Sequence, residues 1–262
     1  MAPSLPHRAG QGTLWLVPNA LDHGTSDPPP LDLTLPRGAI ERSAVLTHWV
    51  VENAKTARAF LKRVQALQPL AQPLQAIDIR ELPRSPKDGR AAVDETAWRE
   101  LLAPALAGHD IGLLSEAGLP AVADPGSALV AQAHAIGLNV VPLAGPSAIT
   151  LALAASGLHG QSFAFVGYLP TEAAARATRV RALEALSRRE RQTQVAIETP
   201  YRNAALMAAL LEVLQPDTRL AVACGVTLPQ GWCRMATVAQ WQQAPPRFEP
   251  KDLPAVFLWL AA

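Results

Sequence analysis

The chain has 262 residues, of which 49% are hydrophobic and 17% are charged, a composition typical of a globular protein rather than a disordered one. Its net charge of +1 provides no general attraction to nucleic acid, so any RNA contact would need a local basic patch. No apolar stretch approaches the ~20 residues that cross a membrane, and the first residues lack the apolar core of a signal peptide. We therefore expect a cytoplasmic protein that does not enter a membrane.

The elements predicted for the first half alternate between strands and helices. In chain order they are a loose arm at 1–11, a strand at 12–17, a Pro-rich loop at 22–38, a strand at 44–51, a helix at 54–67, a strand at 75–82 and a helix at 95–106. Repeated βα units of this kind predict a mainly parallel α/β domain. The Pro-rich loop is either a lid over a site or a flexible surface excursion.

Residues 110–156 contain a strand, a tight loop and a helix twice in succession. Short strands are expected at 111–114 and 139–142, and Asp124 is expected to cap the first helix. Both loops are small and rich in glycine and proline, and ligands of open α/β sheets bind beyond the carboxyl ends of the strands. The two loops therefore predict either a ligand site at this edge or simply well-formed turns.

The pattern changes after Gly157. The predicted elements there are strands at 162–166, 194–197, 220–224 and 255–260, a hairpin strand at 232–238, and helices at 171–187 and 203–214. This order predicts an α+β domain with a mixed sheet. We assign residues 12–157 to an N-terminal domain and residues 161–262 to a C-terminal domain.

Common catalytic motifs are missing from the sequence. It contains no P-loop, no G-x-S-x-G nucleophile elbow, no H-E-x-x-H helix and no G-x-G-x-x-G fingerprint, and we expect no metal site. Glu52, at the end of a strand, is either a catalytic carboxylate or an acid favoured near the next helix N-terminus. The arginines between positions 176 and 191 either contact phosphate or form a solvated helix face.

Five sequence blocks carry a resemblance to a known family. They are GTLWLVP at 12–18, SEAGLPAVADPGSALV at 115–130, VVPLAGPSAITLALAASGL at 140–158, FAFVGYLP at 163–170 and ETPYRN at 198–203. In this order they resemble the tetrapyrrole (corrin/porphyrin) methylase superfamily, nearest to the branch that contains the ribosomal RNA cytidine 2′-O-methyltransferases. The resemblance implies a two-domain fold, S-adenosylmethionine bound in a cleft between the domains, and a homodimer.

The resemblance also implies which residues contact the cofactor. The expected cofactor contacts are Pro18, Gly118, Leu119, Val122, Asp124, Ser147, Ala148, Tyr201, Gly225 and Pro254. A hydroxyl nucleophile would also need a base, for which Glu52 and Glu116 are the candidates. Contacts with an RNA substrate are expected from Arg176, Arg179, Arg188 and Arg189.

The expected function is methyl transfer from S-adenosylmethionine, with RNA or a ribosomal subunit as one possible substrate. The segment ENAKTAR at 52–58 stands where the ribosomal enzymes carry E-D-T-R, and only Glu52, Thr56 and Arg58 represent that motif, so the substrate stays open. One alternative is a methyltransferase that acts on a small molecule such as a tetrapyrrole. Another is a module that binds S-adenosylmethionine without catalysis.

Overall fold

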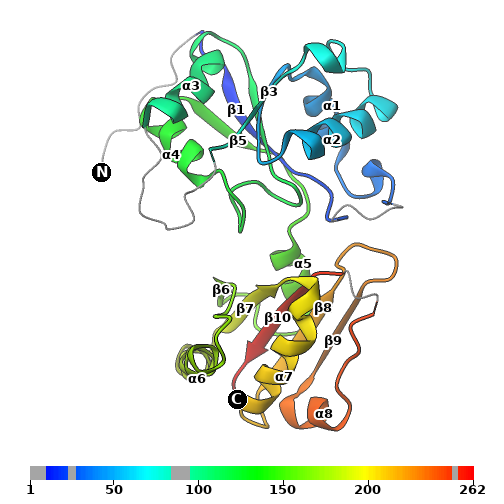
Figure 1. Ribbon diagram of the computed structural model, residues 1–262, viewed down its shortest axis with the longest axis vertical. Helices are drawn as coiled ribbons and strands as arrows, with labels where there is room; N and C mark the ends of the chain where they lie inside the picture. Colours follow the sequence, from blue (N-terminus) through cyan, green and yellow to red (C-terminus); the bar gives the residue numbers. More distant parts are fainter. Residues whose placement is uncertain (1–9, 23–27, 84–94, 250–252) are drawn as a thin grey trace. The chain divides into compact units, whose positions relative to one another are not determined.

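The computed structural model describes residues 10–22, 28–83, 95–249 and 253–262. The chain divides into two compact units, Met1–Pro146 and Ser147–Ala262 (Figure 1). Residues 1–9 of the expected arm and residues 23–27 of the Pro-rich loop lie outside the described part of the chain. Within that part, no helix has both the length and the apolar character needed to cross a membrane.

The first unit is built from alternating strands and helices. Its elements are β1 (Thr13–Val17), η1 (Leu31–Leu33), α1 (Arg37–Val45), β2 (His48–Val51), α2 (Ala54–Leu67), η2 (Leu74–Ala76), β3 (Asp78–Glu81), α3 (Glu95–Leu106), β4 (Ile111–Leu114), α4 (Ser127–Ala135) and β5 (Asn139–Pro142). The strands form one parallel sheet in the order β3-β2-β4-β1-β5. The predicted parallel α/β domain is therefore confirmed.

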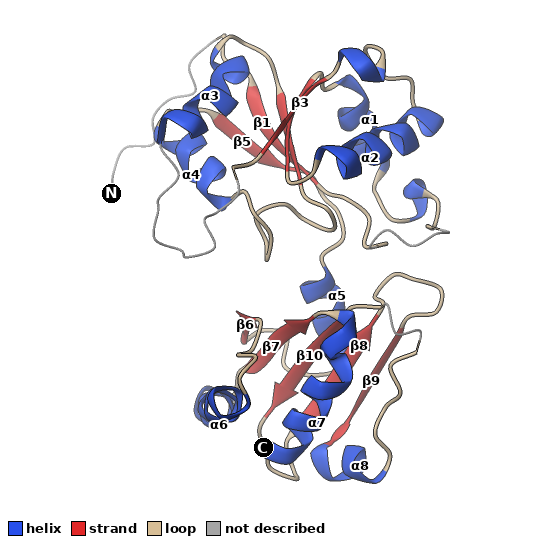
Figure 2. Ribbon diagram, viewed as in Figure 1, coloured by secondary structure: helices blue, strands red, loops and turns tan. Residues whose placement is uncertain are grey.

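Helices cover both faces of this sheet, as Figure 2 shows. Trp49 and Val51 of β2 pack with α1 and α2 on one face, whereas Val50 packs with α3 and α4 on the other. This alternation follows from the strand period of two residues. Burial of each large apolar side chain contributes about 1.5–3 kcal/mol, so both faces stabilise the sheet.

The helix α2 shows how the sequence positions an element beside the later site. The Asn53 side chain caps it, accepting hydrogen bonds from the backbone N–H groups of Lys55 and Thr56 at 2.9 and 3.3 Å. Its buried residues recur at helical spacing and are Ala57, Phe60, Leu61 and Val64. Because the cap fixes the first turn, α2 starts directly beyond the carboxyl end of β2.

The winding of the first unit reverses between β1 and β4. The chain leaves β1 toward α1 on one face and leaves β4 toward α4 on the other. These two strands are direct neighbours, with Trp15 opposite Gly112. In open α/β sheets such a reversal leaves a crevice at the carboxyl ends, which is the usual ligand position.

The second unit has a mixed sheet. Its elements are α5 (Ala148–Ser156), β6 (Phe163–Gly167), α6 (Ala173–Glu190), β7 (Thr193–Glu198), η3 (Pro200–Arg202), α7 (Asn203–Val213), β8 (Arg219–Cys224), β9 (Trp232–Thr237), α8 (Val238–Gln243) and β10 (Ala255–Leu260). The strand order is β6-β7-β10-β8-β9, with β6 parallel to β7 and the other pairs antiparallel. The predicted mixed sheet and the hairpin strand are confirmed.

The unit boundary falls earlier than the predicted one at 157–161. Helix α5 lies in the second unit because Ile149, Ala152 and Leu153 pack against β7, β8 and β10. Helices α6, α7 and α8 pack on the other face of that sheet. The residues that follow the Gly145-Pro146 bend therefore belong to the C-terminal unit.

Local predictions in the first unit differ from the structure at several points, and residues 75–76, predicted as part of a strand, lie in η2. Residues 44–45 end α1 and are not the start of a strand. Asp124 does not cap α4, which starts at Ser127 with Gly126 as its N-cap. Asp124 lies outside α4 because the backbone between β4 and α4 is irregular, with left-handed conformations at Ala121 and Ala123.

Candidate functional site

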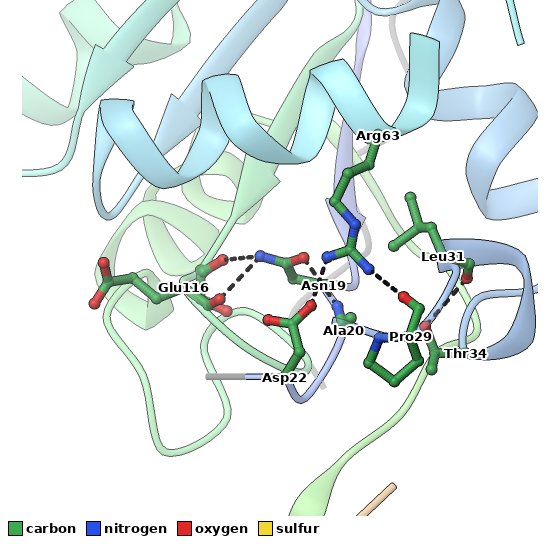
Figure 3. A network of polar contacts seen from close by, with 9 residues as sticks. Asn19, Ala20, Asp22, Pro29, Leu31, Thr34, Arg63 and Glu116 are labelled. Carbon is green, nitrogen blue, oxygen red and sulfur yellow. Dashed lines mark hydrogen bonds and ion pairs between the residues drawn. The ribbon is translucent and has the colours of Figure 1, made fainter. Parts of the chain in front are cut away.

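The loops that follow β1 and β4 are joined at the point where the winding reverses. The backbone N–H of Asn19 donates to the carbonyl of Gly118 at 2.9 Å, and the N–H of Gly118 donates to the carbonyl of Asn19 at 3.2 Å. The Asn19 side chain donates to the carbonyls of Ser115 and Glu116 at 3.3 and 2.9 Å. Figure 3 shows this amide directed at the backbone of Glu116.

The loop after β4 is also fixed to the end of β2. The Glu52 carboxylate accepts a hydrogen bond from the backbone N–H of Glu116 at 3.1 Å. The hydroxyl of Thr56, in the first turn of α2, donates to the Glu116 carboxylate at 3.0 Å. The two predicted catalytic acids are thus brought together, and each uses a carboxylate oxygen to hold the loop.

Asp124 completes an acidic group with Glu52 and Glu116. Its pKa is raised from 3.8 to about 6, first by burial and then by the nearby charge of Glu52, with a smaller contribution from Glu116. A hydrogen bond with the Ser115 side chain partly opposes this shift. Among the described residues, none of these three acids has a basic partner in an ion pair. Their negative charge is therefore available to a positively charged ligand.

The backbone from Ser115 to Gly126 is strained. Ala121 and Ala123 have φ values of 64° and 63°, in the left-handed region that side chains other than glycine rarely adopt. Gly118 has a φ of 72°, and a Cβ atom there would lie 3.1 Å from Leu21 Cδ2. Such conformations concentrate at functional sites, which supports a site at this loop.

The Gly145-Pro146 bend after β5 lies beside the Gly118 bend of the loop after β4, within the same unit. A Cβ atom on Gly145 would lie 2.1 Å from Pro18 Cβ, so only glycine fits there. The carbonyl oxygen of Pro146 lies 3.5 Å from the position of a Cβ atom on Gly118. The predicted contacts Pro18, Gly118 and Asp124 therefore gather at one edge of the first unit, with Leu119 and the 45% exposed Val122 in the same loop.

The predicted contacts of the second unit form a group of their own. The backbone N–H of Gly225 donates to the carbonyl of Pro254 at 2.9 Å. The buried Asn203 side chain donates to the carbonyl of Leu253 at 2.8 Å, which ties the start of α7 to the residue before Pro254. Tyr201, two positions before Asn203, is 81% exposed. These contacts bring Gly225 and Pro254 together and leave the Tyr201 ring accessible.

A small hollow of the second unit adjoins this group. Its volume is about 190 Å³, and it is lined by α5, by the adjoining ends of β8 and β9 and by the residues between these strands, including Gly225. Ser147 and Ala148 lie at the start of α5, where Ser147 is the N-cap residue but its side chain makes no capping hydrogen bond. Every predicted cofactor residue except Tyr201 therefore lies in a bend, a loop or a helix start.

The arginines of α6 do not form one patch. On an ideal helix Arg176 and Arg179 lie about 60° apart, whereas Arg188 is about 120° from Arg176 and about 18 Å farther along the axis. Arg176 donates to the carbonyl of Thr171 at 2.9 Å, Arg188 donates to the carbonyl of Ala262 at 3.0 Å, and Arg189 pairs with Glu190 at 2.7 Å. Arg179 is exposed and is the best placed of the four for an external partner.

Sequence reasoning did not identify Asn19 or Thr56 as site residues. The available signals were a polar residue two positions after the strand at 12–17 and another in the first turn of the helix at 54–67. No group of three or more His, Cys, Asp or Glu side chains in the described ranges is arranged to hold a metal ion.

Residues 39–238 match the family described as Tetrapyrrole (Corrin/Porphyrin) Methylases. This match covers most of the chain, and the chain belongs to that family. The resemblance predicted from the five sequence blocks is therefore confirmed.

Two curated relatives carry the same name. The chain is 35% identical over 206 residues to the ribosomal RNA small subunit methyltransferase I of Micromonospora olivasterospora, covering 79% of this chain and 57% of that protein. It is 40% identical over 126 residues to the protein of that name from Mesorhizobium japonicum, covering 48% of this chain and 42% of the relative. The chain spans about half the length of the curated relatives it matches.

A solved structure shares the fold. The crystal structure of the methyltransferase CobJ aligns with a TM-score of 0.54 and 19% identity, covering 96% of this chain and 95% of that chain. At this identity the likeness extends to the fold, which agrees with the predicted two-domain α/β architecture.

Proposed function

We propose that this protein is an S-adenosylmethionine-dependent methyltransferase that methylates RNA, at a ribose 2′-hydroxyl. The observation that carries the proposal is the acidic group of Glu52, Glu116 and Asp124 beside the Gly118 bend. Membership in the methylase family and the name of the two curated relatives support it.

The residues of the first unit fit the proposed cofactor. S-adenosylmethionine supplies a methyl group and a positively charged sulfonium. The unpaired carboxylates near Asp124 favour a positive ligand, because a nearby opposite charge stabilises the ionised acids. The Gly118 bend lets a ligand approach the backbone closely.

The proposed roles of the acids differ in kind. Glu52 and Glu116 hold the loop through their contacts with the Glu116 N–H and with Thr56. A ribose hydroxyl needs a proton acceptor near it. The pKa of Asp124 is raised to about 6, toward neutral pH, so we assign the base role to Asp124 and the role of holding the loop to Glu52 and Glu116.

The proposed cofactor contacts in the second unit are Tyr201, Gly225, Pro254, Ser147 and Ala148. The bond between Gly225 and Pro254 and the exposure of the Tyr201 ring support this assignment. We assign RNA contact to the exposed side of α6 around Arg179. A homodimer in the cytoplasm completes the proposal, and light scattering of the purified protein tests the dimer.

Calorimetry with S-adenosylmethionine and S-adenosylhomocysteine tests the cofactor. We expect both to bind, and we expect Asp124→Asn to weaken the charged S-adenosylmethionine more than the product, which lacks the sulfonium charge. Equal losses for the two ligands would contradict the role of the acidic group.

Methyl transfer to small ribosomal subunits from a strain that lacks this gene tests the substrate. We expect incorporation of labelled methyl groups into RNA, with an affinity that falls steeply as salt increases. Incorporation into a tetrapyrrole instead would favour the small-molecule alternative. Binding without turnover on either substrate would favour a non-catalytic module.

A further inference from the structure

Asn19 lies at the centre of the contacts that fix the loop after β4. It is 5% exposed, and its backbone pairs with Gly118 in both directions. Its side-chain amide N–H groups donate to the carbonyls of Ser115 and Glu116, and its side-chain oxygen accepts from the N–H of Ala20 at 2.9 Å. No other described residue has a side-chain hydrogen bond that connects the carboxyl ends of β1 and β4.

A second contact fixes the segment that carries Asn19. Arg63 of α2 forms an ion pair with Asp22 and donates to the carbonyl of Pro29 at 2.8 Å. The side chains of Arg63 and Asp22 are 26% and 14% exposed, so solvent screens this pair less than a surface pair. Figure 3 shows the Arg63 guanidinium between Asp22 and Pro29, next to the Asn19 contacts.

We propose that Asn19, anchored by Arg63 through Asp22, is a positioning residue that sets the geometry of the cofactor loop at Ser115–Gly118. This inference rests on the proposed function, since it concerns the loop assigned to the cofactor. Asn19 acts through the loop backbone. Its side-chain N–H groups donate to loop carbonyls and its side-chain oxygen accepts from Ala20, so the side chain is occupied by contacts within the protein and does not itself contact the ligand.

The reason that such a residue is needed lies in the loop itself. Gly118 has no side chain to hold it, and Ala121 and Ala123 occupy strained conformations that persist only when their surroundings fix them. Removing the Asn19 amide leaves the buried carbonyl of Ser115 and the partly buried carbonyl of Glu116 without these donors. An unsatisfied buried carbonyl is unfavourable, so the loop will shift away from the bound geometry.

The first test measures the loop without any ligand. In Asn19→Ala we expect faster amide hydrogen exchange at Gly118, whose N–H donates to the Asn19 carbonyl. The matched control is Asp110→Ala, because the Asp110 carboxylate joins the amino ends of the same two strands by accepting from the Thr13 N–H at 2.8 Å. Asp110→Ala should lower the melting temperature and leave Gly118 exchange near that of the wild type. Equal exchange in the two variants would overturn the inference.

The second test measures the affinity for S-adenosylhomocysteine by calorimetry. We expect Asn19→Ala and Asn19→Asp to weaken binding about tenfold, because both remove the amide donors, whereas Asp110→Ala should bind like the wild type. Asn19→Asp keeps the oxygen that accepts from Ala20, so an unaffected Asn19→Asp would overturn the role of the donors.

A third variant decides the matter if the Asn19 variants fail to fold. Arg63→Met leaves Asn19 in place and removes both of the Arg63 contacts, so we expect a smaller loss of affinity and faster exchange at Gly118. No change in exchange would overturn the inference. A wild-type protein that binds neither S-adenosylmethionine nor its product would refute the proposed function instead, and exchange at Gly118 would still decide the role of Asn19.

Discussion

Glu52 and Glu116 lie just beyond the carboxyl ends of the neighbouring strands β2 and β4, and the Glu52 carboxylate accepts a hydrogen bond from the backbone N–H of Glu116 at 3.1 Å. This contact joins residues 64 positions apart in the chain. It makes the end of β2 a support for the loop after β4.

Replacing Glu52 separates its supporting role from a chemical one. Glu52→Gln keeps an oxygen that accepts from the Glu116 N–H, so we expect S-adenosylhomocysteine to bind within about twofold of the wild-type affinity. Glu52→Ala removes the acceptor and should weaken binding by about fivefold, the effect of losing roughly 1 kcal/mol of hydrogen bonding. Calorimetry measures both. A fall in kcat of about 10²-fold or more in Glu52→Gln with unchanged binding would instead identify Glu52 as the base.

The raised pKa of Asp124 makes the stability of the protein depend on pH. Well below pH 3.8 the carboxyl is protonated in the folded and unfolded states alike, because its pKa is about 6 when folded and 3.8 ordinarily. As the pH rises toward and through 6, the unfolded state releases its proton first, and the stability contributed by the bound proton is lost. We expect Asp124→Asn to melt at a higher temperature than the wild type above pH 6, with the difference shrinking toward pH 4. A difference that stays constant from pH 4 to pH 8 would contradict this reading.

Gly118 tests the need for a left-handed backbone in the loop. Gly118→Ala places a Cβ atom 3.1 Å from Leu21 Cδ2 at a φ of 72°, and the conformation itself costs about 1–2 kcal/mol for an alanine. We expect a lower melting temperature and weaker binding of S-adenosylhomocysteine. The control is Gly38→Ala in α1, where the new methyl group meets nothing within 4 Å. Alanine in a helix is also more stable than glycine by roughly 0.5–1 kcal/mol. A lower melting temperature for Gly38→Ala as well would show that the loss in Gly118→Ala does not come from the left-handed backbone of the loop.

The arginines of α6 should divide into a structural one and an exposed one. Arg176 donates to the carbonyls of Pro170 and Thr171, so Arg176→Ala should lower the free energy of unfolding by about 1 kcal/mol. Arg179→Ala should leave stability unchanged, weaken binding of ribosomal RNA fragments and reduce the salt dependence by about one phosphate contact. Thermal melts and filter binding at several salt concentrations measure these effects. An identical salt slope for wild type and Arg179→Ala would remove Arg179 from the interface.

Much of the fold follows from local patterns. The predicted helices at 54–67 and 95–106 and the strands at 111–114, 139–142 and 255–260 have the bounds that the structure gives. Each combines a clear apolar period with end signals such as the Asn53 cap. Long-range packing was not needed to define them.

Other elements depended on packing that the sequence does not reveal. Helix α1 follows a Pro-rich stretch and contains Gly38, so its end was read as part of the strand that continues to Val51. The segment of α5 is apolar on nearly every side, and its pattern does not indicate which sheet it covers. Its contacts with β7, β8 and β10 assign it to the second unit.

The candidate site, too, could be predicted only where local signals in the sequence indicate it. The loops rich in glycine and proline and the acid at a strand end are local signals, and they indicated this edge of the sheet and Glu52. Gly118 and Asp124 were assigned to the site by the family resemblance. The contacts of Asn19 join residues 96 and 97 positions apart, and no local pattern encodes them. The position of Asp124 outside the helix follows from the left-handed alanines, which sequence propensity disfavours.

Those two alanines also bear on how fast and how tightly the loop can bind a ligand. A glycine at position 121 or 123 would relieve the strain, but it would let the unbound loop sample many more conformations. With alanine, the free loop has few alternatives, so binding loses less conformational entropy. The strain at Ala121 and Ala123 thus accompanies a preorganised loop, which binds a ligand without first having to become ordered.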